Sequence, residues 1–436
     1  MDSIFTDIVG SEWVQRTSEE IPSLGAAQPR IRVMPSTAEQ TAAVLRAASE
    51  NGIAVIPVGS ANHLDLGNPP KRADILLSTE RLNSITEYEP ADLTAAAGAG
   101  CTLEAFNAYL EPHRQLLPWD PAGGDRRTLG GIASIGRNGP LRLGFGQPRD
   151  WILGIEVATV DGKVIRSGGR VVKNVAGYDL TRLFVGSLGT LGVITSLNIK
   201  VRPQPATELT AVIRCNDRNA LWKLATETLA RDILPVALEI ASADAARAAG
   251  IDVVGRADLL CVRFAGEDSD VRKQILAFEA LASEHGLSAP EHIGFESLQA
   301  LWTGLTDLPA RAPIVLKISV PPTKLPGTSS SIIAEFSAVM EEVSCIASPA
   351  FGTLHLLLDG VIDDARCETL AASIASTRNS ITAEHGELTI LRAPNALKQH
   401  VNVWSPVRTS ERLMKATKRL FDPHGILNPG RFVAEI

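Results

Sequence analysis

The residues with the clearest capacity for chemistry are glycines between positions 121 and 200, a stretch that holds sixteen of the chain's 35 glycines. Seven of them fall in three short loops: TLGG at 128–131, SIGRNG at 134–139 and GSLGTLGVIT at 186–195. Glycine is needed where the backbone takes a positive φ or approaches a ligand closely. Successive backbone N–H groups in such loops form concave anion sites. The pattern therefore predicts one large phosphate-bearing cofactor that is held by several separate loops.

A further loop of this kind follows an apolar run in VIPVGSANHLDLG at 55–67. Its residues Gly59, Ser60, Ala61 and Asn62 can wrap a pyrophosphate with consecutive N–H groups, although an ordinary strand and turn would have the same sequence. The two common nucleotide loops are absent, because no G-x-G-x-x-G opens a helix and no G-x-x-x-x-G-K-[ST] occurs.

Charged side chains gather around the glycine loops. Five arginines surround the second loop and suit an anionic ligand, although solvated arginines beside a kinked connection would give the same pattern; they are Arg126, Arg127, Arg137, Arg142 and Arg149. Lys173, Asn174, Tyr178 and Asp179 precede the third loop, where they can approach a ring or a phosphate, or only orient the loop.

The composition is that of a globular protein rather than a nucleic-acid or membrane protein. The 436 residues are enough for two domains or one large domain with an insertion. A net charge of −7 argues against nucleic acid, which requires basic surfaces. No apolar run reaches the roughly 18 residues that span a bilayer. The N-terminal MDSIFTDIVGSEW is no signal peptide, so we expect a cytoplasmic protein.

The five cysteines are scattered along the chain, which favours reduced thiols. No C-x-x-C-x-x-C run occurs. This chain is therefore not expected to hold an iron–sulfur cluster of the ferredoxin kind by itself.

The helices and strands that position the loops are predicted from the spacing of apolar residues and from capping and turn residues. Residues 31–59 predict strand, helix and strand, with Ser36 or Thr37 as the helix cap and Asn51-Gly52 at its end. Thr102 is expected to cap a helix over 103–113. Residues 151–169 predict a hairpin that turns at Asp161-Gly162.

Four units are predicted along the chain: an N-terminal helix over 1–24, a cofactor-binding domain over 25–205, a second domain over 206–390 and a C-terminal segment over 391–436. Strands and helices alternate over 209–360, with helices expected near 218–231, 268–286 and 329–342. This pattern predicts an α+β domain with an antiparallel sheet.

Five motifs in order carry a family resemblance: PVGSAN, TLGGIAS, DWILGIEVATVDGKVI, KNVAGYDLTRLFVGSLGTLGVIT and FDPHGILNPGRF. Together they resemble the FAD-linked oxidases of the vanillyl-alcohol-oxidase type, also called the p-cresol methylhydroxylase (PCMH) type. More narrowly, they are similar to the FAD-binding E subunits of bacterial glycolate oxidase (glycolate dehydrogenase) complexes. The resemblance covers roughly residues 30–205 and the last forty residues; the middle of the chain is less similar.

The resemblance implies an α+β fold in which FAD lies between two subdomains of a PCMH-type domain, with a second α+β domain and a C-terminal tail that returns to the FAD domain. Segments 57–62, 129–142 and 186–194 are then expected to contact FAD. Matched to the motifs, the expected contacts are Pro57, Val58, Gly59, Ser60, Ala61, Asn62, Pro118, Asp120, Leu129, Gly130, Gly131, Ser134, Gly136, Gly139, Arg142, Gly189, Gly192, Val193 and Ile194.

The chain departs from the family in the pyrophosphate loop. Gly59-Ser60-Ala61 stands where the family usually has three glycines, and a positive φ at Ser60 or Ala61 would cost about 1 kcal/mol. His63 lies one position later than the histidine to which some members attach FAD. We therefore expect FAD to be bound non-covalently.

A second departure concerns catalysis. Related catalytic subunits carry H-x-G-D-G-N-x-H, whereas this chain has SPAFGTLH at 348–355, so only Gly352 and His355 remain. No metal is expected. His355 is a candidate catalytic residue or a packed side chain. Arg392, Lys398 and Arg311 are candidates to bind a carboxylate or are surface residues.

The expected function is that of an FAD subunit in a 2-hydroxy-acid (glycolate) dehydrogenase complex. Its expected partners are a catalytic FAD-linked sister subunit and an iron–sulfur subunit, through which it can reach the inner face of the membrane. Two alternatives stay open. The chain is a stand-alone FAD oxidase or dehydrogenase of another hydroxy acid or alcohol, or it is a non-catalytic flavoprotein scaffold.

Overall fold

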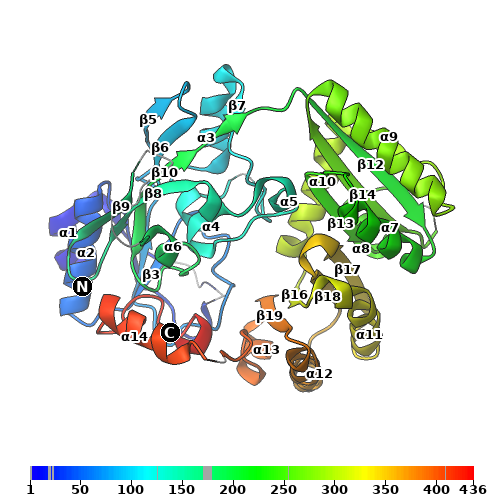
Figure 1. The fold of residues 1–436 in the computed structure, drawn as a ribbon. Coiled ribbons are helices and arrows are strands. Elements are labelled where there is room, and N and C mark those ends of the chain that lie inside the picture. The colour runs from blue at the N-terminus through cyan, green and yellow to red at the C-terminus, as the bar shows by residue number, and fades with distance from the viewer. Residues whose placement is uncertain are drawn as a thin grey trace.

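The chain folds into two halves that lie side by side, and both termini lie on the first half (Figure 1). The computed structural model describes residues 2–17, 21, 24–124, 126–169, 179–253, 255–407 and 409–436. Lys173, Asn174 and Tyr178, which the sequence analysis singled out, lie outside the described residues. Asp179 is described and forms an exposed ion pair with Arg182.

The first sheet has the strand order β1-β2-β4-β3, with β1 at Val14–Arg16, β2 at Ile31–Val33, β3 at Val55–Val58 and β4 at Ile75–Ser78. The strands β2 and β3 both run parallel to β4, and helix α2 (Ala38–Glu50) connects them. The Thr37 side chain accepts a hydrogen bond from the Gln40 N–H and caps α2, which ends at Asn51. The predicted strand–helix–strand unit is thereby confirmed.

The N-terminal helix is much shorter than the predicted span of 1–24. Helix α1 covers Asp2–Val9 and ends where Gly10 takes a φ of 91°, outside the helical region. A short 3₁₀ turn follows over Ser11–Trp13, and then β1 pairs antiparallel with β2. Phe5 and Val9 of α1 are buried in the same core as α2.

The second sheet is antiparallel, with the order β5-β6-β10-β8-β9. Its strands are β5 (Ile85–Glu89), β6 (Thr94–Gly98), β8 (Ile152–Ala158), β9 (Val164–Gly168) and β10 (Val193–Lys200). The β8–β9 hairpin turns at Asp161-Gly162 as predicted. Its helices are α3 (Leu103–Leu110, capped by Thr102), α4 (Leu129–Ile135), α5 (Arg142–Phe145) and α6 (Thr181–Phe184). Strands β7 (Gln115–Leu116) and β11 (Arg202–Pro203) form a separate pair.

The second half is built on an eight-stranded sheet with the order β15-β12-β14-β13-β17-β18-β16-β19, in which every recorded pairing is antiparallel. Its strands are β12 (Thr207–Cys215), β13 (Ala237–Ala241), β14 (Asp258–Gly266), β15 (Glu291–Ile293), β16 (Ile314–Ser319), β17 (Glu342–Ser348), β18 (Thr353–Asp359) and β19 (Glu387–Arg392). The predicted antiparallel α+β domain is therefore confirmed.

Helices cover the two faces of this sheet unequally. One face packs against α7 (Arg218–Ala230), α9 (Asp268–Glu284), α11 (Leu325–Ser337) and α12 (Asp364–Ala383). Within the second half, the helices that pack against the other face are α8 (Ala243–Ala248) and α10 (Phe295–Arg311). Because side chains alternate along a strand, Glu239 of β13 shares this second face with its buried neighbours Ala237 and Ala241. Part of the second face is thus left to meet the first half.

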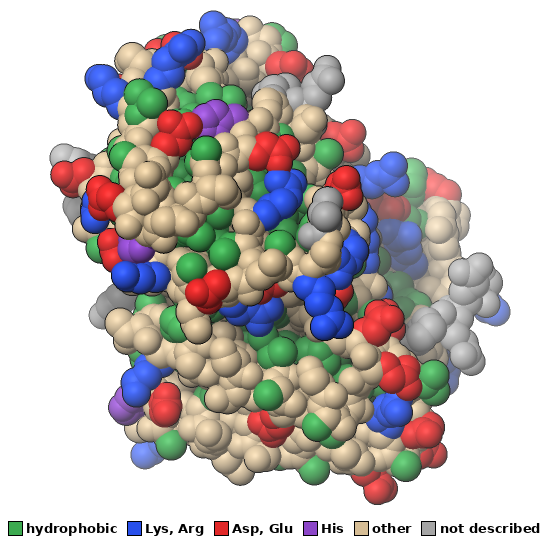
Figure 2. Space-filling model, turned by 90° about the vertical axis from the view of Figure 1, so that its right-hand side faces the viewer, with side chains coloured by type: hydrophobic (Ala, Val, Ile, Leu, Met, Phe, Trp, Pro, Cys, Tyr) green, Lys and Arg blue, Asp and Glu red, His purple; other side chains and the backbone are tan. Residues whose placement is uncertain are grey.

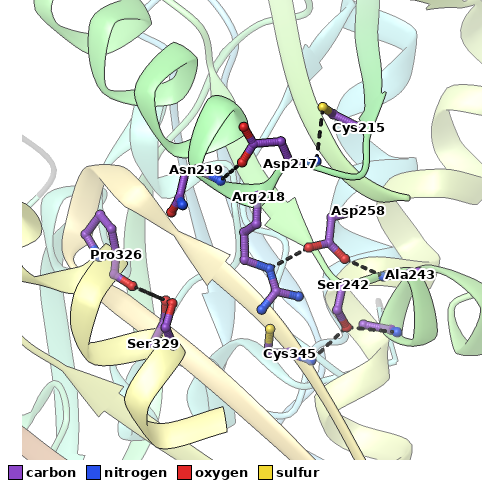
Figure 3. A network of polar contacts seen from close by, with 12 residues as sticks. Cys215, Asp217, Arg218, Asn219, Ser242, Ala243, Asp258, Pro326, Ser329 and Cys345 are labelled. Carbon is purple, nitrogen blue, oxygen red and sulfur yellow. Dashed lines mark hydrogen bonds and ion pairs between the residues drawn. The ribbon is translucent and has the colours of Figure 1, made fainter. Parts of the chain in front are cut away.

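A polar network ties helices α7 and α8 to strands β14 and β17 (Figure 3). Asp258 accepts hydrogen bonds from the Arg218 side chain of α7 and from the Ala243 N–H of α8. Ser242 caps α8 and also accepts a bond from the Cys345 N–H of β17. The network therefore joins four elements through two buried side chains.

We expect Asp258→Ala to lower the free energy of unfolding by about 2–3 kcal/mol, because it leaves a half-buried guanidinium and a buried N–H without their acceptor. Urea denaturation of the two proteins measures this difference. The control is Asp244→Ala, which removes an exposed ion pair on α8 and should cost less than about 1 kcal/mol. Equal losses in both variants would show that the network does not stabilise the fold.

The C-terminal segment returns to the first half, as predicted. It contains α13 (Asn395–His400) and α14 (Glu411–Phe421), the latter lying against the first half in Figure 1. The Val55 N–H donates to the Ile426 carbonyl at 2.8 Å, so the tail continues the edge of the first sheet beyond β3. Lys418 Nζ donates to the Thr190 and Leu427 carbonyls, both at 2.8 Å. The tail thus joins the third glycine loop to β3.

Acidic and basic side chains are interspersed over the face shown in Figure 2. Among the helices of the described residues, none is both long and apolar enough to cross a membrane.

Candidate functional site

Three separated segments meet at the C-terminal end of β3 and line two adjoining cavities. They are the loop after β3, the small-residue helix α4 and the glycine loop before β10. The structure brings together thirteen of the predicted contact residues here: Pro57, Val58, Gly59, Ser60, Ala61, Asn62, Gly130, Gly131, Ser134, Gly189, Gly192, Val193 and Ile194.

Glycine permits close approach at two of these positions. A Cβ on Gly59 would lie 2.1 Å from the Thr128 hydroxyl, which itself caps α4. A Cβ on Gly131 would meet only that hydroxyl, at 2.9 Å, and Gly131 lines both cavities. At Gly131 the backbone of α4 therefore faces both cavities with no side chain in between.

The loop after β3 and helix α4 differ in their free hydrogen-bond donors. The N–H groups of Gly130 and Gly131 are already bonded, to Ala99 O and to the Thr128 hydroxyl. Among the described residues, those of Ser60, Ala61 and Asn62 make no recorded bond. Ala61 has a φ of 61°, so the expected strain of about 1 kcal/mol falls at this position. The loop after β3 donates, whereas α4 supplies only close approach.

Buried cations complete the first cavity. Arg127 and Arg431 line it, and burial lowers the pKa of each guanidinium to about 10. Arg431 donates to the Leu64 and Leu66 carbonyls at 2.9 Å and thereby fixes the chain after the donor loop. Arg127 Nε is buried with no recorded partner. The cavities thus combine exposed backbone at Gly131, free N–H donors on the loop after β3 and the buried, unpaired Nε of Arg127. These features fit a dinucleotide with its pyrophosphate.

Four of the predicted FAD contacts do not line these cavities or the adjoining cleft. Leu129 is fully buried in the core, and Gly136 ends α4 with a φ of 69°. Pro118 is buried, and Asp120 accepts a hydrogen bond from the Leu141 N–H at 2.9 Å. These residues support the segments that line the cavities but do not line the cavities themselves.

A cleft of about 1050 Å³, which includes its part open to solvent, continues from the first cavity to the uncovered face of the eight-stranded sheet. The first half contributes His63, Arg137 and the predicted contacts Gly139 and Arg142. The sheet contributes Glu239, Ser348, His355 and Arg392. The cleft is therefore shared between the two halves.

Burial and positive charge determine protonation in the cleft. His355 pairs with Lys317 across β18 and β16. Burial, with the charges of Arg142, Lys317 and Arg137, holds the pKa of His355 well below its usual value, so its imidazole is neutral at pH 7. Burial likewise lowers the pKa of Lys317 to about 7, and it lowers that of His63 well below normal.

The two carboxyl groups beside the cleft shift in the opposite direction. Burial raises the pKa of Glu239 to about 8 and that of Asp120 to about 7, although Arg142 favours the charged form of both. Both oxygens of Glu239 lie within hydrogen-bond distance of the Ser348 hydroxyl, at 2.8 and 2.7 Å.

Two side chains of residues 348–355, which replace the catalytic motif, contact other residues of the protein. Ser348 stands at the first histidine position of the motif and bonds to Glu239. Phe351 stands at the aspartate position, and the Arg142 guanidinium lies 4.2 Å from its ring centre. Among the described residues, no three His, Cys, Asp or Glu side chains are grouped so that they could hold a metal ion.

Other predicted candidates are placed as follows. Arg392 lines the cleft but pairs with Asp65 at 3.3 Å and donates to the Ala310 carbonyl. Lys398 is buried and donates to the Asp65 carbonyl, and Arg311 is exposed. Of the five arginines near the second loop, Arg127, Arg137 and Arg142 line the cavities, whereas Arg126 and Arg149 are exposed.

The sequence analysis missed Asn428 and Arg431 as lining residues of the first cavity. The available signal was the FDPHGILNPGRF motif, which contains both residues and predicted only that the tail would return to the FAD domain.

Comparison with known families agrees with this geometry. Residues 29–168 match the FAD binding domain family, and residues 204–432, more than half of the chain, match the C-terminal domain of FAD linked oxidases. The chain belongs to the FAD-linked oxidases. It is an oxidoreductase family, and the cofactor is FAD.

Relatives of this FAD-linked oxidase include subunits of glycolate oxidase. It is 28% identical to glycolate oxidase subunit GlcD of Bacillus subtilis (strain 168), which covers 94% of this chain and 90% of the relative. It is 28% identical to glycolate oxidase subunit GlcE of Escherichia coli (strain K12), which covers 87% of this chain and 92% of the relative. D-lactate and D-2-hydroxyglutarate dehydrogenases are also among its relatives.

A crystal structure of p-cresol methylhydroxylase with substrate bound shares the fold, with a TM-score of 0.75 and 15% identity over 99% of this chain and 95% of that one. The predicted PCMH-type two-domain fold is confirmed.

Proposed function

We propose that this FAD-linked oxidase is the FAD-binding E-type subunit of a 2-hydroxy-acid dehydrogenase complex, with glycolate as the first substrate to test. Electrons would pass to an iron–sulfur partner, and a catalytic FAD-linked sister subunit would complete the complex. Any association with the inner face of the membrane would come through these partners. The relatives named as glycolate oxidase subunits support this proposal.

The observation that carries the proposal is the continuity of the FAD cavities with a cationic cleft. The cavities and the cleft share Asn62, His63, Arg127, Ile132 and Ile135 as lining residues. FAD, when bound, supplies the acceptor for the hydride of an alcohol C–H bond. In this proposal the donor loop and Arg127 hold the pyrophosphate, and the cations of the cleft attract the carboxylate of a 2-hydroxy acid.

The altered motif favours a subunit over a self-sufficient enzyme. Ser348 and Phe351 replace polar or charged motif residues and are engaged by Glu239 and Arg142. His355 remains neutral, but three cations nearby disfavour its protonation, which makes it a poor acceptor for the hydroxyl proton. A partner that brings its own FAD site would not depend on these residues.

The isolated chain, reconstituted with FAD, should therefore be yellow but nearly inactive with glycolate and a dye acceptor, and activity should appear when the partner subunits are added. Steady-state assays of the chain and of the co-expressed complex measure this. FAD at 100 times its dissociation constant should also stabilise the chain by about 2.7 kcal/mol.

Three results distinguish the proposed subunit from a stand-alone oxidase and from a scaffold. Robust turnover by the isolated chain, with peroxide formation, would overturn the subunit proposal and favour a stand-alone oxidase. A colourless protein with an unchanged melting temperature would favour a scaffold. FAD binding with activity only in the complex supports the proposal.

A further inference from the structure

Arg127 lies at the meeting point of three cavities. It lines the first cavity, the cleft and an outer cavity that Gly123, Asp307 and Arg311 also line. Only 3% of Arg127 is exposed, and among the residues that the structure describes none forms a recorded hydrogen bond or ion pair with its guanidinium. Burial lowers its pKa to about 10, and the charges of Asp307 and Asp65 act against this shift. The direction of the guanidinium is therefore set by packing.

The guanidinium of Arg127 packs against the backbone of Gly123. Gly123 has a φ of 94°, and a Cβ there would lie 2.1 Å from Arg127 Nη2 and 2.8 Å from both its Cζ and its Nε. The guanidinium thus occupies the space that a side chain on Gly123 would need. The main chain of Arg127 is held separately, because the Leu103 N–H donates to its carbonyl at 2.9 Å. A shift of Gly123 would therefore redirect the guanidinium without displacing the backbone of Arg127.

Asp307 holds Gly123 from the other half of the molecule. It lies near the C-terminal end of α10, and its Oδ1 accepts a hydrogen bond from the Gly123 N–H at 2.8 Å, across 184 positions of the chain. The Asp307 side chain is only 14% exposed, and its Oδ2 lies 3.9 Å from the Arg311 guanidinium, which is too far for a hydrogen bond. One carboxylate oxygen of the second half therefore fixes the residue against which the Arg127 guanidinium packs.

We propose that Asp307 is a positioning residue for FAD: through Gly123 it directs the Arg127 guanidinium toward the pyrophosphate, so that the second half contributes to FAD affinity. This inference rests on the role in FAD binding that the proposed function gives to Arg127. The negative charge of Asp307 by itself repels a diphosphate. The hydrogen bond and the charge of Asp307 therefore affect FAD binding in opposite directions, and two variants separate them.

The test compares the dissociation constants of two Asp307 variants for FAD. Asp307→Asn keeps an oxygen that accepts the Gly123 N–H and removes the charge, so it should bind FAD as tightly as the wild type or more tightly. Asp307→Ala removes both. We expect its dissociation constant to be about five- to tenfold higher than that of Asp307→Asn, which is the effect of one lost hydrogen bond. Titration of the FAD-free chain with FAD, followed by flavin fluorescence, measures both constants.

A double-mutant cycle tests whether the effect passes through Arg127. Arg127→Gln should weaken FAD binding by itself, and in its background the two Asp307 variants should differ by less than about twofold. A merely structural role of Asp307 would keep the full difference. The matched control is Asp363, whose Oδ1 accepts the Arg366 N–H at 2.8 Å and which lines none of these cavities. Asp363→Ala and Asp363→Asn should bind FAD equally, and melting temperatures without FAD show that each variant is folded.

Equal affinities of Asp307→Ala and Asp307→Asn, a difference that persists with Arg127→Gln, or unchanged affinity in Arg127→Gln alone would overturn the inference. These outcomes are separate from failure of the proposed function, which is measured by flavin reduction. The expected cycle with no flavin reduction by any 2-hydroxy acid in the complex would sink the function and leave the positioning role. Flavin reduction in the complex with equal affinities of the two Asp307 variants would do the reverse.

Discussion

Replacing Gly131 by valine is expected to remove FAD from the protein and to leave its fold intact, with an affinity for FAD at least a hundredfold lower. Gly131 lies in α4, where an added Cβ meets only the rotatable Thr128 hydroxyl of the protein. The new side chain would instead enter both cavities that the donor loop and the third glycine loop line. The volume that valine fills is then lost to the dinucleotide.

The measurement is the FAD released into the supernatant by acid precipitation, since we expect non-covalent binding. The matched control is Gly327→Val, because Gly327 is also a helical glycine and a Cβ there meets nothing within 4 Å. Both variants replace a helical glycine by valine, so the change in helix propensity is the same. Full FAD content in Gly131→Val, with circular dichroism unchanged, would show that the dinucleotide does not lie along α4.

The first half of the chain was predictable because its signals are local. Thr37 and Thr102 cap helices three residues before the N–H groups that they accept from, and Asp161-Gly162 closes a hairpin of adjacent strands. Glycine spacing likewise marks each loop within a few residues. Such signals are set by the backbone of one segment and survive in any tertiary context.

The cleft was not predictable in the same way, because it depends on pairings between distant segments. Lys317 and His355 become neighbours only through the β16–β18 register, and Glu239 meets Ser348 across 109 positions. The sequence marked Arg137 as one of five equivalent arginines. Only the approach of the sheet distinguishes it from Arg149, which stays in solvent.

Most of the residues assigned to FAD from motifs line a cavity or the cleft and four do not, for a related reason. A motif records that a residue is needed near the cofactor, but not whether it touches it. Gly136 and Asp120 illustrate this, because one ends α4 and the other holds the Leu141 N–H. Both serve the loop geometry without lining a cavity.

The second large effect concerns pH, and it depends on Glu239. Its side chain is buried and forms no ion pair with any residue that the structure describes; burial raises its pKa to about 8, and that of Asp120 to about 7. In the unfolded chain both groups titrate near pH 4. At these two groups the folded protein therefore holds protons that the unfolded chain has lost, so their contribution to the free energy of unfolding falls as pH rises from about 4.5 to 8.

The expected slope is about 1.4 kcal/mol per pH unit for each proton so held. Glu239→Gln keeps an acceptor for Ser348 but cannot ionise. Burial lowers the pKa of Lys317 to about 7, so Lys317 contributes a slope of opposite sign in this range, but it does so equally in both proteins. Between pH 7 and 8 the slope of the wild-type stability should therefore be more negative than that of the variant by about 1 kcal/mol per pH unit. Urea denaturation at a series of pH values measures both slopes, and Glu342→Gln, an exposed position on β17, is the control.

An unchanged slope in Glu239→Gln would mean that Glu239 is ionised in the folded protein and is stabilised by Arg142. The cleft would then hold one more negative charge beside Arg137, and its attraction for a carboxylate would be weaker. A less negative pH slope of stability in Glu239→Gln than in the wild type would instead mean that the sheet presents a neutral acid to the cleft. The positive charge of Arg137 and Arg142 would then be available to a bound carboxylate, so this titration also measures how strongly the cleft is charged.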